Sequence, residues 1–224
     1  MKTSILLILT VLLCGCVDQK PNPSKGILAF DSEDYATAFA ELSPLAASGN
    51  RVALFYVAEM YAFGLDVPKD RDLAFSYYKD SAEKDYAEAQ HQLGLMYLNG
   101  QSVEKDTLTG FEWIAKAAEQ ELDVAQYTMG IALSMEGSPL PQDIAKGLYY
   151  FKAAADQNYP KALTQLGEYY GFRELNHVKA GEYFDKAAAL GDPQAMHRLS
   201  YAYMDGTVRT QDKQKAHNLL KDLA

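Results

Sequence analysis

The sequence predicts an all-α fold, a right-handed α-solenoid of stacked helical hairpins, and three observations support this. A helical pattern recurs with alanines in register 36 residues apart, at Ala53, Ala89 and Ala125. Within one copy, Ala89, Leu93 and Tyr97 are spaced i, i+4 and i+8, which places them on one face of a helix. Each copy then continues through a turn into a second helical segment that mostly closes on paired alanines. A period of this length is typical of stacked helical hairpins.

The first element, residues 1–15, has the character of a secretory signal. Lys2 precedes the apolar run from Ile5 to Leu13. That run is too short to cross a bilayer core of about 30 Å as a helix, but it has the length of a signal core. We therefore expect residues 1–15 to be a processing segment.

The end of this segment, Leu13-Cys14-Gly15-Cys16, resembles the bacterial lipobox. The resemblance implies that the mature chain begins at an acylated Cys16, with palmitate-like chains holding it to a membrane and 16–25 forming a proline-containing tether. An ordinary secretory signal cleaved nearby is the alternative. Val17 replaces the Asp that retains enteric lipoproteins at the inner membrane, so we expect an outer-membrane anchor facing the periplasm.

The next elements are a divergent half-repeat and five full copies. Residues 26–51 contain "YATAFAELSPLAASG", which resembles a worn second helix and predicts a cap. Residues 52–224 hold the five copies. Gly94 removes a side chain where a neighbouring helix must come close, and Gly100, Gly137 and Gly206 suit the left-handed end of a first helix.

These copies resemble the Sel1-like repeats, relatives of tetratricopeptide repeats, with the pattern A-x-x-x-L-G-x-x-Y-x-x-G followed by a second helix ending in K-A-A. "AQHQLGLMYLNG" from Ala89 to Gly100 carries it closely. Ala58 and Ser200 replace the glycine in two copies, and "GFRELNHV" replaces the usual long loop in the fourth. The resemblance covers residues 52–224 and implies a solenoid that binds proteins.

Composition and motifs restrict the function. The formal net charge of −9 and a pI near 4.9 oppose binding to nucleic acid, which needs a dense basic face. The sequence contains no phosphate-binding loop, nucleophile elbow or zinc-binding histidine pair, so we expect no enzyme activity, no catalytic residue, no metal and no cofactor. Some cysteine-rich relatives are described as β-lactamases, but their internal cysteines are absent here. A hydrolase acting on cell-wall or β-lactam substrates is the alternative.

Two positions in each first helix are predicted to face a concave groove. The first set is Phe55, His91, Tyr127, Thr164 and His197, and the second is Glu59, Leu95, Ile131, Glu168 and Tyr201. Aromatic side chains are favoured interface anchors, so the groove is predicted to bind a partner. Packing between neighbouring repeats is the competing interpretation. Two repeats separate His91 from His197, which is too far for a shared metal ion.

The resemblance also suggests what kind of partner to expect. Sel1-like lipoproteins are similar in design to adaptors of the bacterial envelope, and the family includes immunity proteins that block toxins delivered into the periplasm, among them phospholipases. We therefore expect a membrane-anchored, periplasm-facing module that binds another protein, either as an adaptor or as an inhibitor.

Overall fold

The computed structural model describes residues 21–206 and 211–221, and within those ranges the chain is all α-helical with no strand. The predicted signal peptide and Cys16 lie outside the described residues. The helices are α1 (Pro23–Asp31), α2 (Tyr35–Ala47), α3 (Arg51–Phe63), α4 (Arg71–Ala82), α5 (Ala87–Asn99), α6 (Thr107–Glu119), α7 (Asp123–Ser134), α8 (Ile144–Asp156), α9 (Pro160–Glu168), the π-helical turn η1 (Tyr169–Arg173), α10 (His177–Ala189), α11 (Pro193–Asp205) and α12 (Lys213–Lys221). The predicted all-α solenoid is confirmed.

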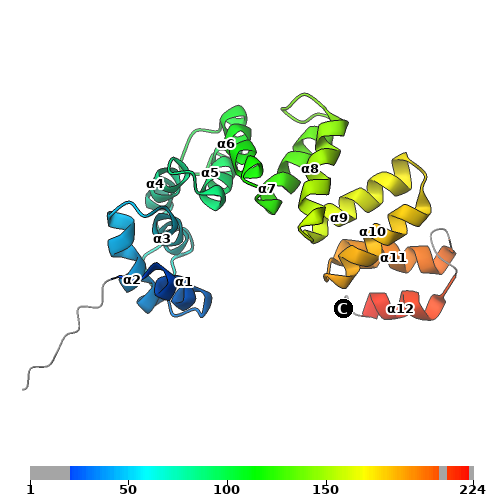
Figure 1. Ribbon diagram of the computed structural model, residues 1–224, viewed down its shortest axis with the longest axis horizontal. Helices are drawn as coiled ribbons and strands as arrows, with labels where there is room; N and C mark the ends of the chain where they lie inside the picture. Colours follow the sequence, from blue (N-terminus) through cyan, green and yellow to red (C-terminus); the bar gives the residue numbers. More distant parts are fainter. Residues whose placement is uncertain (1–20, 207–210, 222–224) are drawn as a thin grey trace, which may run out of the picture.

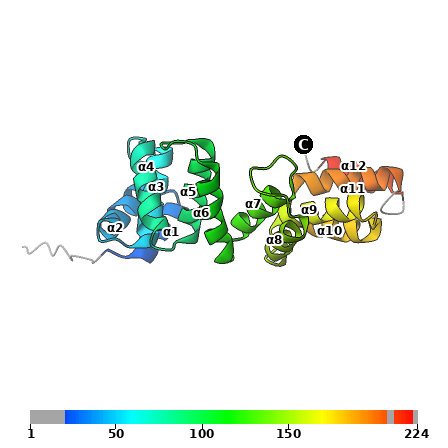
Figure 2. The ribbon, with the colours of Figure 1, turned by 90° about the horizontal axis from the view of Figure 1, so that it is seen from above.

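The helices pair into successive antiparallel hairpins that follow one another along an arch (Figures 1 and 2). Each helix packs mainly against its neighbours in the chain, as expected of a solenoid. The first helices α3, α5 and α7 lie on the inner side of the arch, and α4, α6 and α8 lie further out (Figure 1). The inner side is therefore formed by the first helix in these three repeats.

Local sequence determines where the helices begin and end. The second helices start after an Asp or Asn whose side-chain oxygen accepts backbone N–H groups of the first turn: Asp70, Asp106, Asp143 and Asn176. Gly64, Gly100 and Gly206 end the first helices in the left-handed conformation. The prediction for Gly137 was wrong, because α7 already ends at Ser134 with the extended Met135, and Gly137 takes its positive φ within the following loop.

Tight packing of the two helices within a repeat explains the glycine of the motif. A β-carbon on Gly94 of α5 would lie 2.5 Å from Cγ1 of Ile114 and 2.6 Å from the carbonyl oxygen of Gly110, both in α6. Side chains such as Leu93, Ile114 and Ala117 are fully buried around this contact. The close approach predicted at Gly94 is present.

The amino-terminal region forms a complete helical hairpin, α1 with α2. Asn22 caps α1 by accepting the backbone N–H groups of Ser24 and Lys25, so the helix begins at Pro23, within the segment 16–25 predicted as a tether. Lys25 of α1 forms an ion pair with Glu41 of α2. Within the described residues, no helix is long and apolar enough to cross a membrane.

The fourth repeat departs from the others at the end of its first helix. Here α9 passes at Glu168 directly into the π-helical turn η1, where the first helices of the other repeats continue as regular α-helix for their last turn. The turn leaves Phe172 66% exposed, and Leu175 beyond it takes a positive φ of 52°. Extra-wide turns of this kind are frequent at functional sites, which draws attention to this part of the solenoid.

Candidate partner-binding surface

Four members of the first predicted set, Phe55, His91, Tyr127 and Thr164, lie between successive repeats, whereas His197 of the fifth repeat is exposed. Phe55 of the first repeat packs edge-on against Tyr86, whose ring centroid is 5.3 Å away at the start of the second repeat. Tyr127 of the third repeat likewise meets Tyr159 at 5.3 Å. These aromatic side chains are half-buried and contribute to the packing of one layer on the next.

Two polar members of this set are buried in the same inter-repeat position. His91 is only 7% exposed, and its Nε2 lies 3.4 Å from the hydroxyl of Thr128 in the next repeat. Burial lowers the pKa of His91, partly opposed by the nearby carboxylate of Asp123. Thr164 is 1% exposed and donates its hydroxyl to Asp192 at 2.9 Å. Both side chains therefore join adjacent repeats, and their binding role stays a prediction.

The second predicted set is also partly occupied by contacts within the solenoid. Glu59 is half-buried and accepts a hydrogen bond from the hydroxyl of Tyr78 at 2.6 Å. Burial raises the pKa of Glu59, and this hydrogen bond partly offsets the effect. Leu95 and Ile131 are half-buried and pack against the core clusters. Glu59 and Glu168, the two carboxylates of the predicted groove, lie in the first and fourth repeats and have different partners.

In the carboxyl-terminal part of the solenoid, an ion pair joins the fourth and fifth repeats. Glu168 accepts two hydrogen bonds from the guanidinium of Arg198, at 3.0 Å from Nε and 2.6 Å from the terminal nitrogen, and a third from Gln194 at 2.8 Å. Arg198 also lies over the ring of Phe172, 5.4 Å from its centroid. Because both guanidinium nitrogens converge on Oε1 of Glu168, the pair holds α11 against the end of α9.

Exposed aromatic groups flank this ion pair. Tyr201, one turn beyond Arg198 on α11, is 55% exposed, and its ring stands edge-on to His197 at 4.9 Å. Phe172 on η1 is 66% exposed on the other side of Arg198. Large exposed aromatic side chains beside a fixed charge pair form a surface suited to contact with another protein. We call Glu168, Phe172, Arg198 and Tyr201 the aromatic patch.

Sequence reasoning missed half of this patch. Phe172 and Arg198 were not predicted, whereas Glu168 and Tyr201 were. A prediction shifted by one residue from the first predicted set would have included Arg198. The residues at these shifted positions are all at least partly exposed: Tyr56, Gln92, Thr128, Gln165 and Arg198. Phe172 lies in the fourth repeat's unusual turn, where the repeat pattern offers no register.

The amino-terminal half of the inner side is acidic. Burial raises the pKa of Tyr56, and the nearby carboxylates of Asp31, Glu88 and Glu59 add to the rise. These carboxylates come from α1, α3 and α5 and therefore face one tyrosine from successive layers. Three carboxylates therefore lie near one aromatic ring, and the role of this region in binding stays a prediction.

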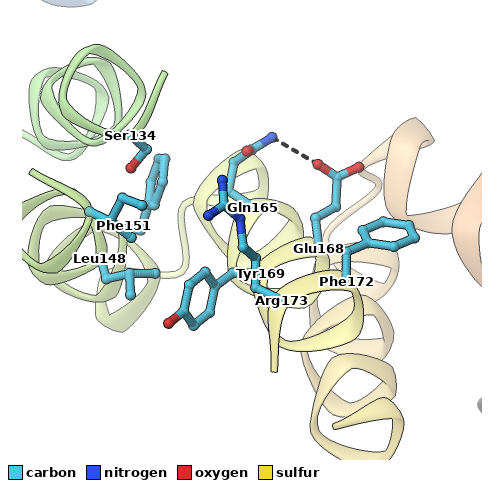
Figure 3. Close-up of a pocket in the computed structure, with 9 residues that line it drawn as sticks. Ser134, Leu148, Phe151, Gln165, Glu168, Tyr169, Phe172 and Arg173 are labelled. Carbon is cyan, nitrogen blue, oxygen red and sulfur yellow. Dashed lines mark hydrogen bonds between the residues drawn. The ribbon is translucent and has the colours of Figure 1, made fainter. Parts of the chain in front are cut away.

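A pocket of about 220 Å³ opens between the third and fourth repeats (Figure 3). Its lining comes from the end of α7, from α8, and from α9 with η1: Ser134, Ile144, Leu148, Phe151, Gln165, Glu168, Tyr169, Phe172 and Arg173. Because Glu168 and Phe172 belong both to the pocket and to the aromatic patch, the two features are continuous. Among the described residues, in the pocket or outside it, no group of three or more His, Cys, Asp or Glu side chains could hold a metal ion.

The fold places this protein in the class of α-solenoid repeat proteins, whose extended concave surfaces are used to contact other proteins. The chain belongs to the Sel1 repeat family: the family model described as Sel1 repeat matches residues 51–86, 87–122, 123–159, 160–192 and 193–221. Proteins with this fold generally serve as non-enzymatic modules for protein–protein interaction.

Solved structures support the same assignment. A Sel1 repeat protein from Oxalobacter formigenes is 29% identical, with a TM-score of 0.83 over 90% of this chain and 83% of that one. A protective antigen of uropathogenic Escherichia coli is 27% identical, with a TM-score of 0.74 over 89% of this chain and 41% of that one. An immunity protein of Pseudomonas aeruginosa shares the fold at 23% identity, with a TM-score of 0.59 over 83% of this chain and 72% of that one.

Proposed function

We propose that this protein is a lipid-anchored protein of the bacterial cell envelope that faces the periplasm and binds a protein partner on the inner side of its solenoid. The observation that carries the proposal is the aromatic patch, in which Phe172 and Tyr201 stay exposed beside the Glu168–Arg198 ion pair. A tyrosine and an arginine at the centre of a surface are the residue types that most often dominate binding energy.

Between the two roles considered, adaptor and inhibitor, we favour an inhibitor of a secreted toxin. Immunity proteins share this fold, and a solenoid surface of this kind is suited to covering another protein. The proposed anchor supports the same role, because an acylated Cys16 would hold the protein at the membrane where an incoming toxin arrives.

The proposal is tested by capture of partners from envelope extracts and then by affinity measurement with the identified partner. The test variant combines Phe172→Ala with Tyr201→Ala. Its matched control combines Leu108→Ala with Tyr149→Ala, which remove side chains that are 61% and 66% exposed on the second helices α6 and α8.

Loss of both patch anchors is expected to weaken binding about thirtyfold, corresponding to about 2 kcal/mol, while the control binds as the unchanged protein does. Circular dichroism and the thermal midpoint should be unchanged in both variants because all four side chains are exposed. If the control loses affinity and the test variant does not, the partner uses the outer face and the proposal is wrong.

A further inference from the structure

We propose that the pocket between the third and fourth repeats binds one tyrosine side chain of the protein partner, while Arg173 holds a carboxylate next to that tyrosine. The inference rests on the proposed function, because it specifies the partner chemistry that one part of the inner face recognises. Three observations carry it: the shape of the pocket, the hydroxyl of Ser134, which has no hydrogen-bond partner, and the guanidinium of Arg173, which forms no ion pair within the described residues.

The pocket exists because a small residue stands where another repeat has a large one. In the second repeat, Leu98 lies directly over Gly110, with its Cδ2 2.7 Å from the place of a β-carbon on that glycine. The equivalent residue in the third repeat is Ser134, whose hydroxyl lies 2.2 Å from the place of a β-carbon on Gly147. The serine leaves space that Leu98 fills in the second repeat, and the corresponding residues of the first and fourth repeats, Ala62 and Gly171, are small as well.

The size and walls of the pocket suit one side chain. Its volume is about 220 Å³, below the roughly 300 to 1,000 Å³ of sites that enclose a drug-sized ligand. Leu148 and Phe151 form one wall and Tyr169 stands across from them (Figure 3). An aromatic ring entering between them would meet apolar and aromatic surfaces, which favour a flat side chain.

The hydroxyl of Ser134 favours a polar tip on that side chain. Ser134 Oγ is the one buried side-chain polar atom in the described part of the chain that has no hydrogen-bond partner, and Ser134 lines the pocket. A buried polar group without a partner is unfavourable, and a ligand that supplies one gains affinity. Once the Ser134 side chain turns from Gly147 toward the pocket, a phenol hydroxyl can donate to this oxygen, whereas phenylalanine and leucine cannot.

Arg173 supplies the charge that selects a neighbouring carboxylate. It lines the pocket and is exposed, and within the described residues it forms no ion pair. Arg198, in contrast, is already paired with Glu168, and Glu174 accepts the hydroxyl of Tyr169 at 2.8 Å. At 0.15 M salt the screening length is about 8 Å, so an acidic peptide segment at the pocket responds to Arg173 more than to the distant excess of negative charge.

The experiment uses a defined probe, the peptide acetyl-Gly-Asp-Tyr-Asp-Gly-amide, titrated into the isotope-labelled full-length protein at 0.15 M salt and followed by NMR. Three further peptides replace the tyrosine by phenylalanine, the tyrosine by alanine, or both aspartates by asparagine. We expect amide shifts at Ser134, Phe172 and Arg173 to saturate with the tyrosine peptide. The phenylalanine and asparagine peptides should each bind about fivefold more weakly, and the alanine peptide should cause no shift.

Variants assign the contacts. Ser134→Leu fills the pocket and is expected to fold, since Leu98 over Gly110 shows that the same arrangement fits; it should abolish the shifts. Ser134→Ala keeps the pocket open and should make the tyrosine and phenylalanine peptides bind equally. Arg173→Glu should weaken the aspartate peptide about tenfold or more and the asparagine peptide little. Arg71→Glu, in the equivalent pocket between the first two repeats, is the matched control and should change nothing.

Two results would overturn the inference: saturable shifts that persist in a folded Ser134→Leu variant, or equal affinity of the aspartate and asparagine peptides. Its failure is distinguishable from failure of the proposed function. If the identified partner depends on Phe172 and Tyr201 but binds Ser134→Leu as it binds the unchanged protein, the proposed function stands and the tyrosine pocket does not.

Discussion

Gly94 has no side chain because atoms of another helix occupy the place where a β-carbon would be. The nearest are Cγ1 of Ile114 and the carbonyl oxygen of Gly110, both within 2.6 Å of that place. A backbone carbonyl cannot rotate out of the way as a flexible side chain could. The glycine of the repeat motif is therefore required by the distance between the two helices of a hairpin.

Gly94→Ala is expected to lower the free energy of unfolding by about 1 to 3 kcal/mol, the usual cost of overpacking a core. Gly171→Ala is the control, since its β-carbon would lie at an ordinary 3.4 Å from Ala180 and its φ is not positive. That change should be neutral or stabilise by up to about 1 kcal/mol. Urea denaturation of both variants measures the difference, and equal stabilities would show that the helices separate freely.

Glu59 is a carboxylate that folding moves into a less polar environment. Burial raises its pKa above the ordinary value of 4.5, although the hydroxyl of Tyr78 donates to it. The folded state therefore holds this proton more tightly than the unfolded state does. The stabilisation is fully present below about pH 4.5 and is lost as the pH rises through the raised value, so at neutral pH a charged Glu59 opposes folding.

Glu59→Gln should consequently raise the free energy of unfolding at pH 7, because the amide is neutral and avoids the cost of burying a charge. The glutamine oxygen still accepts the hydroxyl of Tyr78, so the packing is kept. At pH 4 the gain should vanish. Urea titrations at both pH values test this against Glu119→Gln, an exposed control on α6; a variant that is less stable than the native protein at pH 7 would contradict it.

At the scale of elements, helix starts differ between the two helices of the second, third and fourth repeats. The second helices begin with side-chain caps, whereas α5, α7 and α9 begin after Tyr86, Leu122 and Tyr159 without a capping side chain. These three residues are half-buried, so apolar packing takes the place of the cap. The second helices consequently depend more on local polar sequence.

Asp143→Ala should therefore cost about 1 kcal/mol, within the range of 0.5 to 2 kcal/mol found for lost caps. Asp143 accepts the backbone N–H of Lys146 at 2.9 Å at the start of α8. Asp156→Ala, at the other end of the same helix, is the control and should be neutral or slightly stabilising, since a negative charge there opposes the helix dipole. Thermal unfolding of the two variants checks the order, and a larger loss for Asp156→Ala would refute the cap.

The turn η1 is the element that most changes the surface. In the fourth repeat the chain enters it directly from α9, exposing Phe172 and bringing Arg173 to the pocket. An α-helical last turn like those of the other repeats would place both residues differently. The shortened connection thus links one irregularity in the sequence to the aromatic patch and to the pocket.

At the scale of the whole molecule, the solenoid and the proposed anchor are separate units. Cys16→Ala should release the protein from membranes into the soluble periplasmic fraction, because the variant lacks the thiol that would carry the proposed acyl chains. Its circular dichroism spectrum and thermal midpoint should stay unchanged, since the described helices begin at Pro23. Fractionation followed by immunoblotting measures this, and a variant that remains membrane-bound after signal cleavage would exclude acylation as the anchor.

The repeat pattern was sufficient to predict the all-α solenoid and the close approach at Gly94. Both follow from periodicity, which repeats the same spacing of Ala, Leu, Gly and Tyr in each copy. Gly137 shows the limit: the motif predicts a glycine near the end of a helix, but the extended Met135 ends α7 earlier. Boundaries depend on local contacts that the pattern does not contain.

The sequence by itself determined the family, the order of helices and the chemical character of the inner face, because these depend on residues close together in the chain. Only the tertiary structure decided which side chains stay open. His91 and Thr164 are buried between layers, whereas Arg198 and Phe172 meet from different repeats to form the aromatic patch. Successive side chains on an α-helix are rotated by about 100° around its axis, so a residue that faces the neighbouring repeat can be followed by one that faces solvent. The stacking of whole repeats decides which of the two is buried.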